Sequence, residues 1–232
     1  MSDYVIIGNG TAATGCIEGI RSVDPNGKIT LISKEKHKVY SRPLISYLLE
    51  GKTDVERMKY RSDDFYDKNG VSFFPGISAA KIDADKKEIS LDNEEKIAFD
   101  KVCVSTGSSP FVPPFEGLDT VEKKFSFMTL DDALSLKDAL NPESRVLIVG
   151  AGLIGLKCAE GIKDLVKEIT VCDLADRILS SILDAECAGI MQKHLEENVE
   201  QNYVNNRAAC IVMDVNSGEI LAMATKPDFD PN

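Results

Sequence analysis

The sequence predicts an α/β fold in which two similar strand–helix–strand units are joined by a small antiparallel meander and followed by a β-hairpin. Continuous apolar runs that lead through a glycine turn into a segment of helical spacing begin near residue 4 and again at residue 145. Such runs are typical of parallel strands covered on both faces, because both alternating sets of side chains are then buried. Short alternating runs between residues 71 and 99 predict the meander, and two apolar runs after residue 198 predict the hairpin.

The first unit opens with residues 4–8 (YVIIG), which are apolar throughout and predict a central strand. The segment after them repeats Ala12, Cys16 and Ile20 at every fourth position, which is helical spacing. A turn of Asp, Pro, Asn and Gly precedes a second strand over residues 28–33. Together these elements form one βαβ unit.

The same patterns assign the middle and later parts of the chain. Residues 101–105 (KVCVS) predict a return to a buried strand, and the proline-rich stretch 110–114 predicts a crossing between domains. The second βαβ unit has strands over 145–149 and 168–172 around a helix that carries Ile154, Cys158 and Ile162, and residues 184–197 are again helical in character.

The composition indicates a soluble globular protein without a nucleic-acid or membrane partner. The chain has 232 residues, of which 43% are hydrophobic, and a formal net charge of -11. A chain this acidic repels phosphate backbones and anionic lipid headgroups. The first residues run directly into an apolar strand without a secretory signal, and the longest near-apolar stretch, 146–156, is shorter than a bilayer. We therefore expect a cytoplasmic protein whose partners are small molecules or a redox protein.

The cysteines form no recognisable metal or disulfide motif. They stand at positions 16, 103, 158, 172, 187 and 210, with no CxxC pair and no zinc spacing. Most lie within apolar runs, so we expect buried, reduced thiols and no metal site.

A glycine fingerprint of the form GxGxxA follows the first strand. Gly8 permits a tight turn, Gly10 lets the backbone approach a pyrophosphate, and Ala13 is small enough for helix and strand to pack closely. Thr11 opens the helix, whose free N–H groups and macrodipole favour an anion. Glu35, two residues beyond the second strand, stands where an acidic side chain would receive ribose hydroxyls. The alternative is a packing-driven glycine turn with an unrelated surface glutamate.

A second fingerprint follows the strand that begins at residue 145. It consists of Gly150, Gly152 and Gly155, with Leu153 and Ile154 at the start of the helix. Asp173 ends the next strand, where its carboxylate would accept from a ribose 2′-hydroxyl and repel a 2′-phosphate. This position predicts NADH rather than NADPH.

Two such fingerprints in one chain predict two Rossmann-like dinucleotide-binding units that serve as a donor site and a carrier site. NADH gives up a hydride, and a bound flavin such as FAD accepts it and passes electrons on singly or in pairs. We expect the cofactors to supply the chemistry and the protein to position them, without a general acid or base. No catalytic residue is assigned.

Both fingerprints, together with two stretches between them, resemble the pyridine nucleotide-disulfide oxidoreductase superfamily, and within it the branch of rubredoxin, ferredoxin and nitrite reductases. The resemblance covers about residues 1–197. In the stretch YSRPLISYLLEG, Arg42 and Pro43 fall where the family contacts its flavin, and in VSTGSSPFVPP, Thr106 and Gly107 occupy its ATG-like motif. The resemblance implies FAD and NADH as cofactors and electron transfer to a protein acceptor, such as rubredoxin or ferredoxin, or to a small molecule. A homo-oligomer is consistent with it.

The chain also departs from the family pattern. Dithiol members keep reactive cysteines in the region that reads SRPLIS here, so we expect no cysteine relay at this place. Many members carry a lysine where Tyr47 stands and a glutamate where Lys157 stands, which bears on flavin tuning and nicotinamide placement. We expect Lys157 to be a solvated helix residue.

The last residues resemble a different family, the transpeptidase domain of class B penicillin-binding proteins. The stretch NRAACIVMDVNSGEILAMATKPDFDPN is similar to the first hairpin of such domains, with its turn at residues 216–218. This tail carries neither a Ser-x-x-Lys nor a Lys-Thr-Gly motif, and without an activated serine no acyl-enzyme forms. We expect no β-lactam binding, and a fused or misassembled reading frame explains the tail more simply than a two-function protein.

These observations predict three segments. Residues 1–112 are the first part of an FAD-binding domain, residues 113–197 a truncated NAD-binding domain, and residues 198–232 the hairpin tail. In the family a later segment with a Gly-Asp motif completes the FAD domain, and we expect that segment to be missing. An NADH-dependent flavoprotein oxidoreductase is the first hypothesis. A non-catalytic nucleotide-binding fragment is the second, and a cell-wall module led by the tail is the last.

Overall fold

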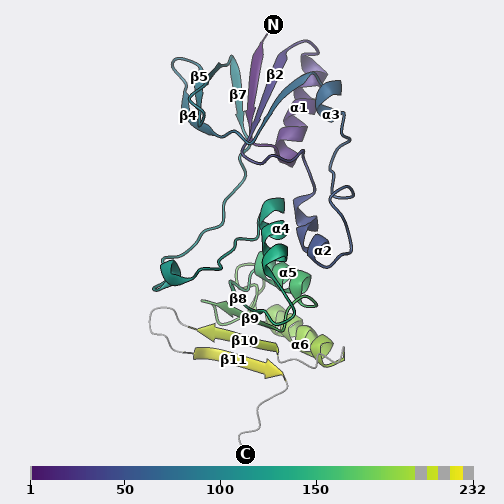
Figure 1. Ribbon diagram of the computed structural model, residues 1–232, viewed down its shortest axis with the longest axis vertical. Helices are drawn as coiled ribbons and strands as arrows, with labels where there is room; N and C mark the ends of the chain where they lie inside the picture. The colour runs from purple at the N-terminus through teal and green to yellow at the C-terminus, as the bar shows by residue number, and fades with distance from the viewer. Residues whose placement is uncertain (1, 202–207, 214–219, 227–232) are drawn as a thin grey trace, which may run out of the picture. The chain divides into compact units, whose positions relative to one another are not determined.

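The chain divides into two compact units, each with its own sheet. The computed structural model describes residues 2–201, 208–213 and 220–226. The first unit comprises Met1–Ser41 and Val55–Ser109, and the second comprises Arg42–Asp54 and Pro110–Asn232 (Figure 1).

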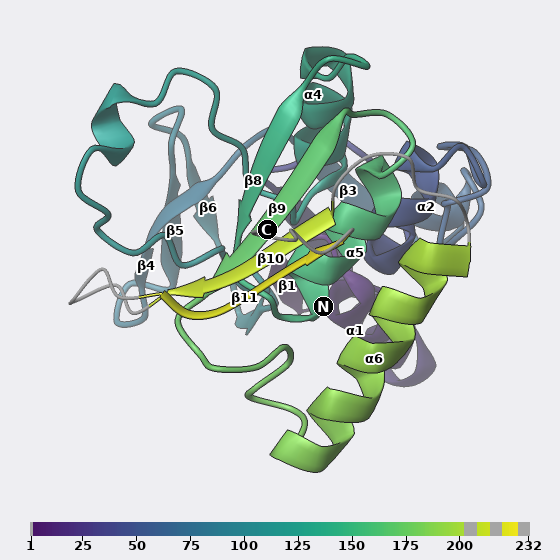
Figure 2. The same ribbon diagram turned by 90° about the horizontal axis from the view of Figure 1, so that it is seen from below.

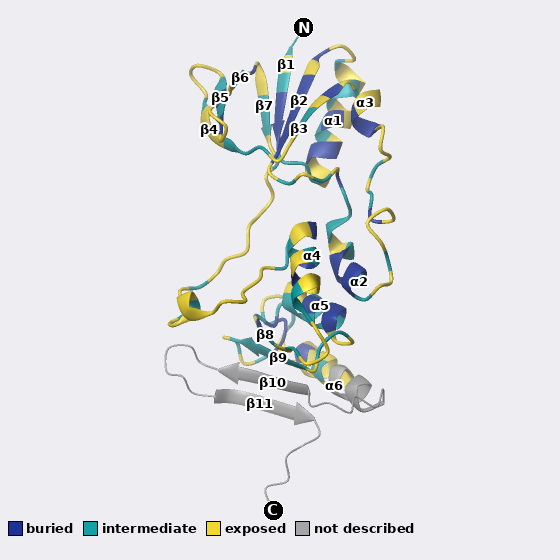
Figure 3. Cartoon of the chain, in the orientation of Figure 1, coloured by how far each residue is buried: buried dark blue, intermediate teal, exposed yellow. Residues whose placement is uncertain are grey.

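The first unit is built on a parallel sheet of four strands in the order β3-β2-β1-β7. These strands are β1 (Asp3–Ile7), β2 (Lys28–Ser33), β3 (Val71–Pro75) and β7 (Lys101–Val104). The central strands β1 and β2 are largely buried (Figure 3). The predicted βαβ unit is confirmed, since β1 and β2 pair in parallel from Asp3 opposite Lys28 to Ile7 opposite Ile32. Both faces of these strands are apolar because each face packs on a separate cluster of the core.

Helix α1 (Thr11–Val23) packs on one face of this sheet. Its buried residues are Ala13, Thr14 and Ile17, whereas Ala12 is exposed. The buried face of α1 therefore lies about one position away from the predicted repeat of every fourth residue from Ala12. Ala12 and Ala13 are both small enough to be buried, so the sequence alone does not decide which of them faces the sheet. The short helix α3 (Phe65–Lys68) precedes β3.

The predicted meander is present as a separate antiparallel sheet of three strands, β4 (Ala79–Asp83), β5 (Glu88–Leu91) and β6 (Lys96–Ala98). It begins later than predicted, because residues 71–75 form β3 and pair in parallel with β2. Strand β7 also differs from the prediction of a buried strand. It is paired with β1 on one side, and its residue Val104 is 60% exposed, as on an edge strand.

The second unit has a sheet in the order β11-β10-β9-β8, and Figure 2 shows helices α5 and α6 beside it. Strands β8 (Arg145–Val149) and β9 (Glu168–Asp173) are parallel and flank helix α5 (Leu153–Ile162), as predicted. The other elements are η1 (Arg42–Leu44), α2 (Ile45–Leu49), η2 (Leu118–Thr120), α4 (Leu130–Ala139) and α6 (Ala185–Gln201).

The predicted hairpin is confirmed by the antiparallel pairing of β10 (Ala208–Met213) with β11 (Ile220–Lys226). Its predicted turn at residues 216–218 lies outside the described residues. The hairpin also pairs β10 in parallel with β9, so it extends the sheet of the second unit. The chain thus continues from β9 through α6 to another parallel strand, because the apolar strand after α6 pairs with the open edge of β9. The predicted boundary at residue 198 stays a prediction.

The expectation of buried thiols is only partly met. Cys158 is buried, three others are half-buried, and Cys187 is exposed; none of these five forms a disulfide, and the burial of Cys210 is not described. Within the part of the chain that the structure describes, no helix is long and apolar enough to cross a membrane. Among the same residues, no group of three or more potential ligands gathers around a metal position.

Helix α4 begins with a complete capping box. The Asp132 N–H donates to Thr129 Oγ1 at 3.0 Å, and Asp132 Oδ2 accepts from the N–H groups of Met128 and Thr129, each at 2.9 Å. Burial disfavours the Asp132 carboxylate, but these backbone donors and Ser126 outweigh it and hold its pKa below the ordinary value of 3.8.

This box yields a pH-dependent prediction for Asp132→Asn. Because the pKa of Asp132 is depressed in the folded state, its contribution is present above the unfolded-state pKa and disappears as the pH falls through the folded-state pKa. At pH 7 the variant should lose about 1 kcal/mol of unfolding free energy, and the difference should shrink as the pH falls below 3.8. Urea unfolding at pH 7 and at an acidic pH below 3.8 measures it, with Asp138→Asn at the other end of the helix as control. A loss that is equal at both pH values would contradict this role.

Candidate dinucleotide-binding sites

The first glycine turn lies at the carboxyl end of β1 and depends on Gly8 having no side chain. Gly8 has φ +102°, and a Cβ at this residue would lie 2.3 Å from the carbonyl oxygen of Ser105. Its N–H donates to the carbonyl oxygen of Ile32 at 2.8 Å, which ties the turn to β2. Gly8 is therefore required by both its backbone conformation and the close approach of another chain segment.

Helix α1 starts at this turn with its N-terminus open. Gly10 is the N-cap, it makes no side-chain capping bond, and the first helical turn carries no acidic residue. A Cβ at Gly10 would meet no atom within 4 Å, so space is open beside the loop. Thr11 is exposed, whereas Ala13 is fully buried against the sheet. The tight turn at Gly8 and the burial of Ala13 are as expected, and the space beside Gly10 is open, whereas the approach of a pyrophosphate there stays a prediction.

The segment that follows β7 packs directly on the Gly8 turn. The Ser105 N–H donates to the Ile7 carbonyl at 2.8 Å, and Ser105 Oγ lies within hydrogen-bond reach of the carbonyl oxygens of Ile7 at 3.0 Å and Gly8 at 3.2 Å. Thr106 and Gly107 come next and are exposed. Gly107 has φ +70° and no atom within 4 Å of where a Cβ would stand. The structure therefore brings the ATG-like motif, after β7, next to the first fingerprint, after β1, at the carboxyl ends of two neighbouring parallel strands.

Glu35 lies in the loop after β2, and its backbone and side chain are both bonded. Its carbonyl oxygen accepts from Ser33 Oγ at 2.8 Å and from the Gly76 N–H at 3.4 Å. Its Oε2 accepts from the Tyr40 hydroxyl at 2.5 Å. The carboxylate is thus held in place on the carboxyl-end side of β2.

Asn9 braces the same loop, a role that the sequence analysis missed. Asn9 Nδ2 donates to the His37 carbonyl at 3.1 Å, and the Tyr66 hydroxyl donates to Asn9 Oδ1 at 2.7 Å. That hydroxyl also accepts from the Val39 N–H at 3.0 Å, and burial raises the pKa of Tyr66. Asn9 occupies a variable position of the fingerprint, so its residue type alone gives no signal for this bond.

The second glycine turn repeats this geometry at the end of β8. Gly150 has φ +112°, and its N–H donates to the Cys172 carbonyl at 2.6 Å. A Cβ at Gly155 would lie 1.9 Å from the carbonyl oxygen of Gly150, whereas one at Gly152 would meet nothing within 4 Å. Gly152 caps α5 without a side-chain bond, and the first turn, with exposed Leu153 and Ile154, carries no acidic residue.

Two other helices of the second unit begin differently. Helix α4 has its capping box, and Asp184 Oδ1 accepts from the Cys187 N–H at 2.8 Å at the start of α6. Protein carboxylates therefore occupy the N-termini of α4 and α6, while those of α1 and α5 lack such an acceptor. No capping side chain therefore competes with an external anion for the first helical N–H groups of α1 and α5.

Asp173 is the last residue of β9 and is bonded to the second glycine turn. Its Oδ2 accepts from the Ala151 N–H at 2.5 Å, and its Oδ1 accepts from the Ala175 N–H at 2.9 Å. The side chain predicted to select the ribose is therefore adjacent to the loop predicted to hold the pyrophosphate.

Arg42 and Pro43 belong to the second unit rather than to the unit that carries Gly8. They begin η1, and Arg42 Nη1 donates to the Met128 carbonyl at 2.9 Å, while Pro43 is exposed. The FAD-binding domain predicted over residues 1–112 includes this segment, because it lies between elements of the first sheet along the chain, and that domain boundary stays a prediction.

Lys157 lies on α5 with 39% of its side chain exposed, in keeping with the expected solvated helix residue, and it also has two partners. Its Nζ bonds Glu160 Oε2 at 2.5 Å and lies 5.1 Å from the ring centroid of Tyr47. The hydrogen bond to Glu160 raises the pKa of Lys157, and Tyr47 adds to this. The two positions at which the chain departs from the family pattern therefore contact each other between α2 and α5.

These features define a protein with two glycine turns at parallel strand ends, each opening an uncapped helix. Residues 2–212 match the family model described as pyridine nucleotide-disulphide oxidoreductase. The chain belongs to this family, whose members are NAD(P)H-dependent oxidoreductases.

Individual relatives agree with this membership. The chain is 32% identical to the NADH-dependent phenylglyoxylate dehydrogenase subunit epsilon of Aromatoleum evansii, over 82% of this chain and 45% of the relative. It is 31% identical to the assimilatory nitrate reductase electron transfer subunit of Bacillus subtilis, over 83% of this chain and 25% of the relative. A putidaredoxin reductase–putidaredoxin complex matches with a TM-score of 0.78 and 21% identity, over 98% of this chain and 55% of that one, which supports the fold. The chain thus spans less than half the length of these two relatives.

Proposed function

We propose that this chain binds FAD at the first glycine turn and NADH at the second, and serves a flavoprotein oxidoreductase that passes electrons from NADH to an acceptor. One observation carries the proposal. Both turns combine an open space at the second glycine with a helix N-terminus that no side chain caps. Such N-termini bind the pyrophosphate of a dinucleotide through backbone N–H groups and the helix dipole.

In this proposal the residues around the first turn bind and orient the flavin dinucleotide. The N–H groups after Gly10 receive the pyrophosphate, and the Glu35 carboxylate receives the ribose hydroxyls. Thr106 and Gly107 contact the cofactor from the neighbouring strand end, where their exposure leaves room.

The residues around the second turn hold the nicotinamide dinucleotide. Gly152 allows close approach, the N–H groups of Leu153 and Ile154 face the pyrophosphate, and Asp173 accepts from the ribose. Bound FAD would accept the hydride directly, so the protein needs no general acid or base for that step. The flavin would also allow the two electrons to be passed on one at a time.

The acceptor that we propose is another redox protein, such as a rubredoxin or a ferredoxin. The similarity to a subunit named for electron transfer supports this choice. The region SRPLIS holds no cysteine, so a thiol relay at the place used by dithiol members has no residue to form on.

The proposal is tested by purifying the chain with added FAD and recording its visible spectrum. We expect a flavin absorbance that persists through gel filtration and bleaches when NADH is added without oxygen. Absorbance that persists without bleaching would instead support the non-catalytic nucleotide-binding fragment. The absence of retained flavin would overturn the assignment of the first turn.

Asp173 yields a prediction on cofactor choice. The unaltered chain should be reduced by NADH at least tenfold faster than by NADPH, because a carboxylate repels the 2′-phosphate. Asp173→Asn keeps an acceptor for the Ala151 N–H and removes the charge, so the preference should fall several-fold, with a modest loss of stability because the amide cannot also accept from the Ala175 N–H. Anaerobic reduction rates with the two cofactors measure this ratio. Asp176→Asn, an exposed carboxylate that pairs with Arg177, is the control. A preference for NADPH in the unaltered chain would refute the role of Asp173.

A further inference from the structure

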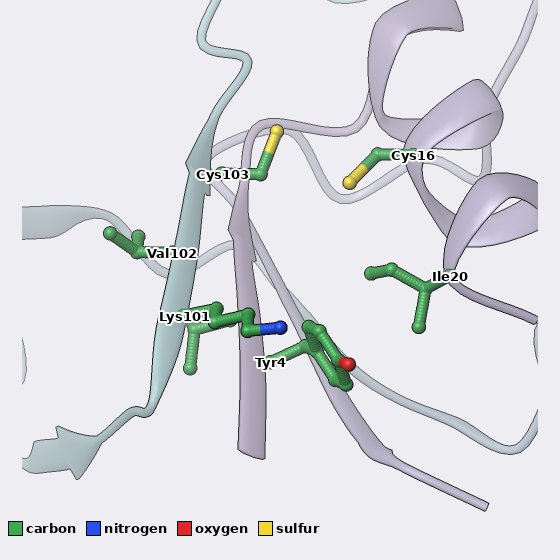
Figure 4. A pocket seen from close by; sticks show the side chains of 7 residues that line it. Tyr4, Cys16, Ile20, Lys101, Val102 and Cys103 are labelled. Atoms are coloured by element: carbon green, nitrogen blue, oxygen red, sulfur yellow. The ribbon is translucent and has the colours of Figure 1, made fainter. Parts of the chain in front are cut away.

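Two cysteines that are far apart in sequence face each other in the first unit. Cys16 stands on α1 and Cys103 on β7, opposite Ile6 of β1. Figure 4 shows their sulfur atoms on the facing sides of one pocket. A hydrogen bond joins the two side chains. Neither residue belongs to a CxxC pair, which is why the sequence analysis did not connect them.

The pocket between these cysteines is small, largely apolar and open to solvent. It has a volume of about 150 Å³ and is lined, besides the two cysteines, by Tyr4, Val5, Ile20, Lys101 and Val102. Both thiols are half-buried. A small reagent can therefore reach them, and the hydrogen bond between the two side chains means that the sulfurs lie close together.

We propose that Cys16 and Cys103 form a reversible redox site, which a peroxide oxidises to a disulfide that joins α1 to β7. One thiolate attacks the peroxide, breaks its O–O bond and becomes a sulfenic acid, with hydroxide or an alkoxide leaving. The second thiol then attacks that sulfur, and water leaves as the S–S bond forms. Over both steps the two thiols lose two electrons and two protons. The peroxide accepts both and becomes two molecules of water, or one of water and one of alcohol.

The position of this disulfide would matter for the first glycine turn. Helix α1 begins at Gly10, and β7 leads into Ser105, which packs on Gly8. The bond would connect the helix and the strand that carry the two halves of this turn, and would close a long loop of the chain. Closing a long loop reduces the entropy of the unfolded state, so the oxidised unit should melt at a higher temperature.

The surroundings of Cys16 set the rate of the reaction. Burial, and then the hydrogen bond with Cys103, raise the pKa of Cys16 to about 11. The other polar groups in the pocket are Lys101, whose Nζ lies 5.4 Å from the ring centroid of Tyr4, and the Tyr4 hydroxyl, which bonds Asp24 Oδ2 at 3.1 Å. Since the thiolate is the nucleophile and both pH values lie well below this pKa, attack by Cys16 should be slow at pH 7 and about a hundredfold faster at pH 9.

The experiment treats the 232-residue chain carrying Cys187→Ser, which removes the exposed thiol, with hydrogen peroxide at pH 7 and pH 9. Remaining thiols are then blocked and the chain is digested with trypsin without reduction. We expect a linked pair of peptides, residues 1–21 and 102–123, with a mass 2 Da below their sum, that separates on adding dithiothreitol. The melting temperature should rise by roughly 5–10 °C on oxidation.

Matched variants locate the effect. Cys103→Ala should abolish the linked peptides and the rise in melting temperature, whereas Cys172→Ala, at a half-buried thiol of the second unit, should change neither. Peroxide treatment that leaves Cys16 and Cys103 reduced at pH 9, or that takes them separately to sulfinic or sulfonic acids, would overturn the proposal. The peptide map of the Cys187→Ser chain decides between these results even if Cys103→Ala fails to fold. It needs no bound cofactor, so its outcome is independent of the proposed flavin site.

Discussion

The Gly8→Ala variant should lose about 2–4 kcal/mol of unfolding free energy and should retain no FAD. Gly8 has φ +102°, which strains any residue with a side chain, and the new methyl group would stand 2.3 Å from the carbonyl oxygen of Ser105. The turn or the strand end after β7 must move to admit it. Urea denaturation and flavin absorbance after gel filtration measure the two effects.

The matched control, Gly10→Ala, separates folding from binding. Gly10 has φ −101°, and an added Cβ meets no protein atom within 4 Å. Stability should therefore change by less than about 1 kcal/mol. The affinity for FAD should still fall at least tenfold, because the methyl group occupies the space through which the pyrophosphate approaches. Unchanged FAD affinity in a folded Gly10→Ala variant would show that the first turn holds no dinucleotide.

The second large effect is expected for Gly155→Ala. The added Cβ would stand 1.9 Å from the Gly150 carbonyl oxygen and 3.1 Å from its carbonyl carbon. These are backbone atoms, so the collision cannot be relieved by turning a side chain, and α5 must shift away from β8. The loss in unfolding free energy should be about 3 kcal/mol, and NADH binding should disappear.

Gly152→Ala is the companion variant at this turn. A Cβ there meets nothing within 4 Å, so the second unit should stay folded with near-native stability. Its dissociation constant for NADH should rise at least tenfold while FAD retention is unchanged. Equal loss of both cofactors would contradict the assignment of separate turns to separate cofactors.

The parts of the fold that follow from local patterns were predictable. Each fingerprint needs only a buried strand, a turn with positive φ and a helix that starts at a small residue. Residues that follow one another along the chain determine all three features. The positive φ of Gly8 and Gly150 fits this expectation. The acidic residue at the end of β9 was predictable for the same reason, because Asp173 directly follows an apolar run.

Contacts between distant residues were not predictable in this way. The bonds of Asn9 with Tyr66 and with the His37 carbonyl, and the pairing of Cys16 with Cys103, depend on which strands become neighbours. A single sequence carries no periodic signal for such pairs. The placement of residues 42–54 in the second unit also depends on contacts between distant residues. Their position along the chain, between elements of the first sheet, had instead suggested the first domain.

The hairpin shows where a correct local prediction gave an incomplete arrangement. Alternation and a turn predicted the β10–β11 pair, which is present. The pairing of β10 with β9 depends on an open sheet edge, which the tail sequence itself does not reveal. The resemblance of residues 198–232 to a transpeptidase hairpin stays a prediction, and the pairing of these strands is compatible with it.

The central claim is that the two glycine turns hold two different dinucleotides at the same time. Equilibrium dialysis tests this claim directly. The chain is dialysed against FAD alone, against NADH alone, and against FAD together with oxidised NAD, which replaces NADH so that no turnover takes place. We expect one FAD and one nicotinamide dinucleotide per chain, with neither displacing the other. Mutual displacement at a single site, or binding of neither dinucleotide, would contradict the account.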